Sequence, residues 1–162
     1  TFDLDSTTLF RSLKTSPEFR QQFVISFMDM LNNNFAPANV EKVLADYGYT
    51  LDWLDGFFRK RPTYAVQHLA EEFDLTGSLE TVTVTTAHPE MGSVTVNTSR
   101  IDLSSGSWSG QYFTDYPITV TAAANDGYKF VGWKGDTDGA GETVTVSVDG
   151  GITLEAVFAK VQ

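Results

Sequence analysis

The chain has 162 residues, 41% of them hydrophobic and 20% charged, which suffices for one ordinary domain or two small ones with a real core. Its net charge of −10 argues against nucleic acid as a partner, because both surfaces would be anionic. No apolar run approaches the ~20 residues that cross a bilayer. The absence of cysteine excludes disulfides, thiolate metal sites and a cysteine nucleophile. Because the first residue is Thr1, we expect a processed chain or a part of a longer protein.

The first half of the chain has the apolar spacing of helices, and we expect four or five of them before residue 76. Asp5 or Ser6 can cap a short first helix. Ser16-Pro17-Glu18 predicts the start of the second, because a hydroxyl cap, a proline in the first turn and an acid near the helix dipole favour that position. An apolar stripe at steps of four residues follows and predicts a buried helix: Phe19, Phe23, Phe27 and Leu31.

Asparagine, proline and glycine set the remaining helix boundaries. The run Asn32-Asn33-Asn34 should end the second helix. Pro37 should begin a third, and Gly48 suits its C-terminal end. Pro62 is expected to break a fourth helix and to begin a fifth, because proline lacks the amide hydrogen that an interior helical position needs.

Valine and threonine alternate after residue 77, which is typical of strands with one buried face and one solvated face. The alternation predicts strands at 80–85, 93–97, 118–122, 143–148 and 152–156. Turns are expected at 90–92, 125–127 and 149–151, where Asn, Asp and Gly tolerate positive φ. The prediction is therefore a two-part α+β protein, with an all-α subdomain over residues 1–76 and a small, mostly antiparallel β domain of five to seven strands over residues 77–162.

Few residues have the spacing of a catalytic or metal site. His68 and Glu72 lie one turn apart on an expected helix and can share a metal, although a solvated surface cluster is the simpler interpretation. The loop Asp136–Glu142 alternates carboxylates with other residues, as calcium loops do, but it lacks the remaining ligands of an EF-hand, and an acidic hairpin tip is the alternative. Phosphate-loop, nucleophile-elbow and zinc-helix signatures are missing. We therefore predict no catalytic residue, no cofactor and no metal.

One basic run and two aromatic residues are the remaining candidates. Arg59-Lys60-Arg61 either contacts an anionic neighbour or, as we favour, places cations near the carbonyl end of a helix that stops at Pro62. Trp108 and Tyr112 lie in a Gly/Ser-rich segment that we expect to be an exposed loop. They are the candidate ligand-binding residues, because exposed aromatic rings can stack on sugars, whereas the alternative is that they fill the core of the sheet.

The β half resembles the bacterial extracellular repeat that is related to internalin B repeats. The resemblance covers about residues 79–159. It rests on the segments Met91-Gly-Ser-Val-Thr-Val96, Asn125-Asp-Gly-Tyr-Lys-Phe-Val-Gly-Trp133 and Leu154-Glu-Ala-Val-Phe158. The resemblance implies that the aromatic residues of the second segment belong to the core. It also implies a stalk, spacer or adhesive element on a secreted or wall-attached bacterial protein.

The helical half resembles the C-terminal end of the spore-coat CotH kinase-like family. The similarity rests on Phe19-Arg-Gln-Gln-Phe23, on the turn before Phe35, and on Phe57-Phe-Arg-Lys-Arg-Pro62 leading to Phe73-Asp-Leu-Thr-Gly77. In that family the nucleotide and metal residues lie upstream of this tail, and no position here matches them. The resemblance therefore implies no catalytic role for this chain.

These observations predict a non-enzymatic C-terminal fragment of a secreted or surface-exposed bacterial CotH-like protein, with a structural or interaction role. Its partners would be an upstream domain of the parent protein and a protein or cell-surface glycan ligand. If the helices complete such a domain, some apolar surface on them should be exposed. The alternatives are a carbohydrate-binding module that uses Trp108 and Tyr112 and an enzyme that uses His68 with Glu72.

Overall fold

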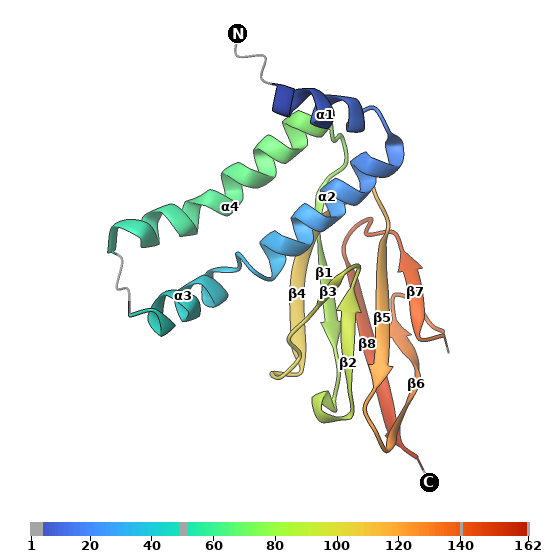
Figure 1. Ribbon diagram of the computed structural model, residues 1–162. Coiled ribbons are helices and arrows are strands. Elements are labelled where there is room, and N and C mark those ends of the chain that lie inside the picture. The colour runs from blue at the N-terminus through green and yellow to red at the C-terminus, as the bar shows by residue number, and fades with distance from the viewer. Residues whose placement is uncertain (1–4, 49–51, 140, 162) are drawn as a thin grey trace.

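The computed structural model describes residues 5–48, 52–139 and 141–161, as four helices followed by a β region (Figure 1). The helices are α1 (Asp5–Leu13), α2 (Pro17–Asn32), α3 (Pro37–Asp46) and α4 (Asp52–Phe73). The β region contains a short 3-10 helix, η1 (Pro89–Met91), and eight described strands: β1 (Leu79–Thr85), β2 (Gly92–Val96), β3 (Ser99–Arg100), β4 (Ser107–Phe113), β5 (Ile118–Ala124), β6 (Tyr128–Gly135), β7 (Thr143–Val146) and β8 (Ile152–Lys160). The predicted two-part α+β class is confirmed.

The second and third helices begin and end where their capping residues predict. At the start of α2, the Ser16 hydroxyl accepts a hydrogen bond from the Phe19 amide at 3.3 Å and donates one to Glu18 at 2.7 Å. The bond from Ser16 lowers the pKa of the Glu18 carboxyl, which keeps a negative charge at the positive end of the helix. The third helix starts at Pro37 and is followed by Gly48, whose φ of +72° suits a helix end.

The predicted helix break at Pro62 is wrong. A single helix, α4, runs through this residue from Asp52 to Phe73, so the expected fourth and fifth helices are one. Proline removes the hydrogen bond that its own amide would donate to the carbonyl of Phe58, and its ring crowds that carbonyl, but the helix continues on both sides. Leu69 and Phe73 at the far end of α4 are almost completely buried, and their packing offsets the local cost of the proline.

Two four-stranded sheets form a β sandwich. Their strand orders are β4-β1-β8-β6 and β3-β2-β5-β7, and every pairing between the described strands is antiparallel except that of β1 with β8. The Val/Thr alternation works as expected on β1, where Val82 and Val84 are fully buried. Gly92 on β2 lies so close to the facing sheet that a Cβ there would stand 2.3 Å from the ring of Phe158. The two sheets therefore pack face to face over a single apolar layer.

Three strands lie outside the predicted list, and the described residues contain one strand more than the upper bound of seven. The most informative is β4, which was expected to be a loop because it contains serine and glycine in place of β-branched residues. It pairs along its whole length with β1, from Leu79 opposite Phe113 to Thr85 opposite Ser107. Pairing with an alternating neighbour has therefore overridden the weak strand propensity of the segment.

The helices and the sandwich share one hydrophobic core. Val24 and Met28 of α2 and Phe73 of α4 belong to the same buried cluster as the valines of the sheets. The connection between α4 and β1 is fixed by Asp115, whose carboxylate accepts hydrogen bonds from the amides of Thr76 and Gly77, each at 3.0 Å. Figure 1 shows the helices gathered at one end of the sandwich, with the end of β8 at the other.

Candidate functional site

A buried carboxylate joins the helices to the sandwich. Asp29, on α2, is only 1% exposed, and four groups from the β region donate hydrogen bonds to it. Oδ1 accepts from the Tyr112 hydroxyl at 2.7 Å and from Asn97 Nδ2 at 2.9 Å. Oδ2 accepts from the Thr98 amide at 3.3 Å and from the Thr98 hydroxyl at 3.1 Å. Such a charge is tolerated inside a protein only when its acceptor sites are filled in this way.

Asn97 makes this junction rigid from the sandwich side. It lies in the turn between β2 and β3 with a φ of +51°, a conformation that asparagine tolerates better than most residues. Its side-chain oxygen accepts a hydrogen bond from the backbone amide of Thr119 at 2.9 Å. The backbone amide of Asn97 donates to the Thr119 carbonyl at 2.6 Å. Asn97 thus connects β5, the turn and α2 in one network.

The expectation that Tyr112 is exposed is wrong. Tyr112 is 2% exposed, and its hydroxyl donates the shortest of the four hydrogen bonds to Asp29. Burial first, and then the Asp29 carboxylate, raise the pKa of the Tyr112 phenol well above its usual range, so the phenol remains a hydrogen-bond donor. A sugar ring cannot stack on this residue in the folded protein.

The same helix also caps the free edge of β4. Asn32 Oδ1 accepts from the Gln111 amide at 2.9 Å, and Asn32 Nδ2 donates to the Gln111 carbonyl at 2.8 Å. The side-chain amide therefore takes the place of a neighbouring strand at this point and blocks further pairing there. The ring of Trp108 and the side chain of Asn32 both lie against Gly110, where an added Cβ would stand 2.5 Å and 2.9 Å from them.

An apolar groove lies between α2 and α4 and has a volume of about 270 Å³. Phe27 and Leu31, one turn apart on α2, form one wall. The other wall comes from α4, and the residues that complete the lining are Phe35, Phe57, Phe58, Arg61, Pro62 and Ala65. Phe35 and Phe57 are 44% and 51% exposed, so this surface is open to solvent.

The groove exists because the predicted apolar stripe of α2 is covered over only half of its length. Near α1, Phe23 stacks on Phe73 of α4 with ring centroids 5.0 Å apart, and Phe10 closes the cluster at 5.6 Å from Phe23. Beyond that cluster the two helices separate toward α3 (Figure 1). Phe27 and Leu31 therefore face an open groove and are only partly buried.

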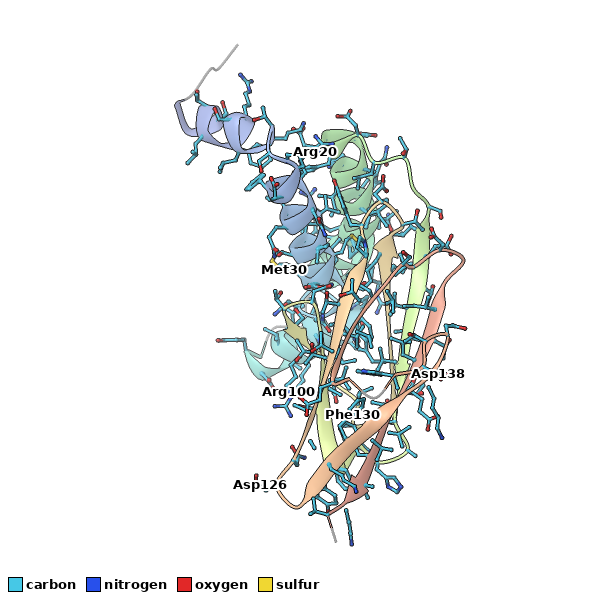
Figure 2. All side chains as sticks on the ribbon, turned by 90° about the vertical axis from the view of Figure 1, so that its right-hand side faces the viewer. Arg20, Met30, Arg100, Asp126, Phe130 and Asp138 are labelled. Atoms are coloured by element: carbon cyan, nitrogen blue, oxygen red, sulfur yellow. The ribbon has the colours of Figure 1, made fainter. Side chains whose placement is uncertain are left out.

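Exposed apolar residues are concentrated on the helical half. Among the described residues, eight of the ten large hydrophobic side chains that are clearly exposed lie before residue 65. Val43 on α3 and Tyr47 directly after it are 52% and 76% exposed. Met30 projects from the outer side of α2 (Figure 2) and is 44% exposed. The exposed apolar surface that the sequence predicts on the helices is therefore present.

Trp108 lies at a second, polar hollow of about 560 Å³ between the helices and the sandwich. It is partly buried, and the hollow is otherwise lined by Asn32, Asn33, Asn34, Ala36, Asn39, Ser99, Arg100, Asp102 and Ser109. The Ser104 amide donates to Asp102 at 2.9 Å and lowers the pKa of that carboxyl. Arg100 lies on the side of the sandwich that faces α3 (Figure 2), so both signs of charge border the hollow.

The structure does not bring further ligands to the histidine and acidic candidates. His68 is exposed, and Glu72 forms a 2.6 Å ion pair with Lys14. In the acidic loop, Asp136 Oδ2 accepts from the Thr153 amide at 2.6 Å and so fixes the loop to β8. Within the described part of the chain, no three His, Asp or Glu side chains are placed to hold a metal ion, and no helix is long and apolar enough to cross a membrane.

The basic run has a different position from the one predicted. Because α4 does not stop at Pro62, Arg59-Lys60-Arg61 lies inside a helix and not at its carbonyl end. Arg59 pairs with Glu41 of α3 at 2.9 Å. The guanidinium of Arg61 lies 5.9 Å from the ring centroid of Phe57 and lines the apolar groove. The interpretation of the run as a set of helix-end cations is therefore wrong.

Sequence reasoning missed Asp29 and the groove. A single Asp between Met28 and Met30, within an apolar stripe, was the available signal for a buried polar contact. No sequence signal indicated the groove. The apolar stripe on α2 predicts that this face is buried, but it does not predict whether a neighbouring helix covers the whole length of the stripe.

Comparison with known families identifies the β half. The family model of the divergent InlB B-repeat domain matches residues 80–162, and nothing in this match extends to the helices or supports their resemblance to the CotH family. No curated protein and no solved structure is significantly similar to the chain. The match covers the whole sandwich, including the predicted Gly-Tyr-x-Phe-x-Gly-Trp segment, whose Trp133 is buried and packs on Phe130 at 5.3 Å. The chain belongs to the divergent InlB B-repeat domain family.

Proposed function

We propose that the chain is a non-catalytic interaction module of a bacterial surface protein. The sandwich acts as a spacer, and the helical end docks onto a neighbouring domain. The observation that carries the proposal is the uneven distribution of exposed apolar side chains, which gather on the helices and leave a groove between α2 and α4. Repeat domains of the matched family are typical of bacterial surface proteins, which supports this location.

The neighbouring domain that we propose is a CotH-like lobe encoded before residue 1. The resemblance of residues 1–76 to the tail of that family motivates the choice. The exposed apolar side chains of the helical half support the choice, because such a lobe would cover them. The catalytic residues of a kinase-like parent, if it is active, would then belong to the lobe and not to this chain.

Hydrogen exchange tests this proposal directly. The chain is produced alone and together with the polypeptide that its gene encodes upstream, and amide exchange is compared segment by segment. We expect slower exchange in the longer protein over Phe57–Ala65 of α4 and around Phe35, with little change in β7 and β8. Equal exchange throughout the helices in the two proteins would refute the docking role.

A second candidate function is glycan binding at the hollow beside Trp108. The specific observation in its favour is the combination of an indole ring with asparagine amides, Arg100 and Asp102 around one open site. Tyr112 has no part in it, since its ring is buried. Calorimetric titration with cell-wall oligosaccharides, comparing the natural chain with Trp108→Ala, tests this function. If Trp108→Ala gives the same heat of binding as the natural chain, Trp108 is excluded as a glycan-binding residue.

A further inference from the structure

We propose that the groove between α2 and α4 binds an amphipathic helix with acidic flanks. This inference rests on the docking function proposed above and specifies the chemistry of the partner. The docking function predicts that the helical end is covered. The present proposal states which part of the surface is the binding site, which secondary structure fills it and which sign of charge the partner carries.

The shape of the groove favours a helix over a strand. Its walls are side chains of two helices, and its lining includes no strand edge to which an extended peptide could add. Along α2, the lining from Phe27 to Leu31 spans one turn, and Phe35 follows after the helix end. A third helix laid between them would insert apolar residues at i, i+4 and i+7, as in a helical bundle.

The charge of the groove favours an acidic partner. The chain carries 11 basic residues against 21 acidic ones, yet among the described residues that line this groove the one charged side chain is the basic Arg61. The Arg61 guanidinium lies 5.9 Å from the ring centroid of Phe57, at the border of the apolar lining, and Arg61 is exposed. Arg59 already pairs with Glu41 at 2.9 Å, which shows an acidic side chain of another helix in contact with the basic run. Glu or Asp on the flank of a docked helix would extend the same kind of contact to Arg61.

A second copy of the chain is a less suitable occupant than an acidic helix of a different domain. Two copies would each bring a net charge of −10, and their mutual repulsion opposes association. A partner that concentrates its acidic residues on one helix meets Arg61 without bringing a second whole acidic surface into contact. Self-association is accordingly an outcome of the test that would overturn the proposal.

Three synthetic peptides of about 18 residues, long enough to hold some helix in water, serve as probes. The first has leucines at i, i+4 and i+7 with glutamates on both flanks. The second replaces every glutamate by lysine, and the third scrambles the first so that the apolar period is lost. Binding to the whole chain is measured by fluorescence anisotropy. We expect the acidic amphipathic peptide to bind at least about tenfold more tightly than either control.

Two variants locate the site and one matched variant controls for general effects. Phe57→Ser removes a ring that is 51% exposed, so the fold should survive while affinity falls by about tenfold or more. Arg61→Glu should weaken the acidic peptide and strengthen the lysine peptide. Val131→Ser, on β6, removes a similarly exposed apolar side chain at a distance from the groove and should leave binding unchanged. Circular dichroism confirms that each variant is folded.

Several results would overturn the proposal. They are equal binding of the scrambled peptide, tighter binding of the lysine peptide to the natural chain, absence of any binding, and a dimer in light scattering that Phe57→Ser abolishes. The hydrogen-exchange comparison is independent of these measurements. Protection of α4 in the longer protein together with failure of the acidic peptide would preserve the docking function and reject only the partner chemistry.

Discussion

Replacement of Asp29 tests whether one buried carboxylate holds the helices on the sandwich. The residue is suited to this test because all four donors in its network come from the β region, from Tyr112, Asn97 and Thr98, while the acceptor belongs to α2. Asp29→Ala removes both carboxylate oxygens that accept these four hydrogen bonds. Asp29→Asn keeps the shape and one oxygen, and its NH₂ must face one pair of donors.

The expected loss follows from the donors that are left unpaired. Each buried donor without a partner costs about 1–3 kcal/mol, so four of them would cost at most about 12 kcal/mol if the terms were additive. The sum is smaller because the alanine variant no longer has to desolvate a carboxylate, which itself costs several kcal/mol, and because water can enter the space. We therefore expect Asp29→Ala to reduce the free energy of unfolding by about 3–5 kcal/mol.

The asparagine variant should lie between the natural chain and the alanine variant. Asn97 cannot turn to accept from the new NH₂, because its own oxygen is already bound to the Thr119 amide. If the oxygen of the introduced amide stays with Tyr112 and Asn97, its NH₂ faces the Thr98 amide, donor against donor. We expect a loss of about 1–3 kcal/mol for Asp29→Asn, which corresponds to one unsatisfied pair.

Urea unfolding at neutral pH measures these losses. Helix content is followed by circular dichroism. The sandwich is followed by the fluorescence of Trp108 and Trp133 in chains that carry Trp53→Phe, because Trp53 belongs to α4 and would otherwise add to the emission. If the junction couples the two halves, the two transitions coincide in the natural chain and separate in Asp29→Ala. A change in unfolding free energy below about 0.5 kcal/mol for Asp29→Ala, the level of an ordinary surface substitution, would refute the assigned role.

Three further predictions follow from single contacts. Since the folded-state pKa of Tyr112 is raised, the contribution of this residue to stability is complete below pH ~10 and is lost as the pH rises above that value. Absorbance at 295 nm should therefore show one tyrosine that ionises only when the protein unfolds. Tyr112→Phe should remove that step from the titration. Pro62→Ala restores a helical amide to α4 and should raise the unfolding free energy by about 1–3 kcal/mol in urea titrations, whereas an unchanged value would show that α4 is frayed there. Gly92→Ala places a Cβ 2.3 Å from the Phe158 ring and should lower the melting temperature through a loss of about 1–3 kcal/mol, while Gly56→Ala, where the added Cβ meets nothing within 4 Å, should not lower it.

The sequence predicted those helix starts and strands that depend on residues within or next to the element itself. The starts of α2 and α3 depend on residues next to them, Ser16, Pro17 and Pro37, and these boundaries are confirmed. The same holds for the strands with Val/Thr alternation, since a half-buried strand carries its own period. The resemblance of the β half to internalin B repeats is likewise confirmed, because its motif residues lie within one continuous stretch.

The errors arise where a neighbour distant in sequence decides the outcome. The segment Ser107–Phe113 becomes a strand because β1 pairs with it and Asn32 caps its open edge, contacts that lie 22 to 79 residues away in the chain. Tyr112 is buried for the same reason, because its partner Asp29 is 83 residues away. Pro62 fails to end a helix because Phe73, further along the same helix, packs against Phe23 of another helix. The side chains of Asp52 and Asp55, a carboxylate pair in the sequence, lie outside the described residues.

The division into residues 1–76 and 77–162 separates two kinds of secondary structure, while the stabilising contacts cross it. Val24 and Met28 complete the core of the sandwich, and Asp29 carries a network made of sandwich residues. These contacts attach the helices to one end of the sandwich. A docking surface on a rigid support loses less conformational entropy on binding than one on a flexible tether. Under the proposed docking function, the buried junction and the open groove on α2 act together: one face of the helix is held on the sandwich through Asp29, and another face presents Phe27 and Leu31 to the partner.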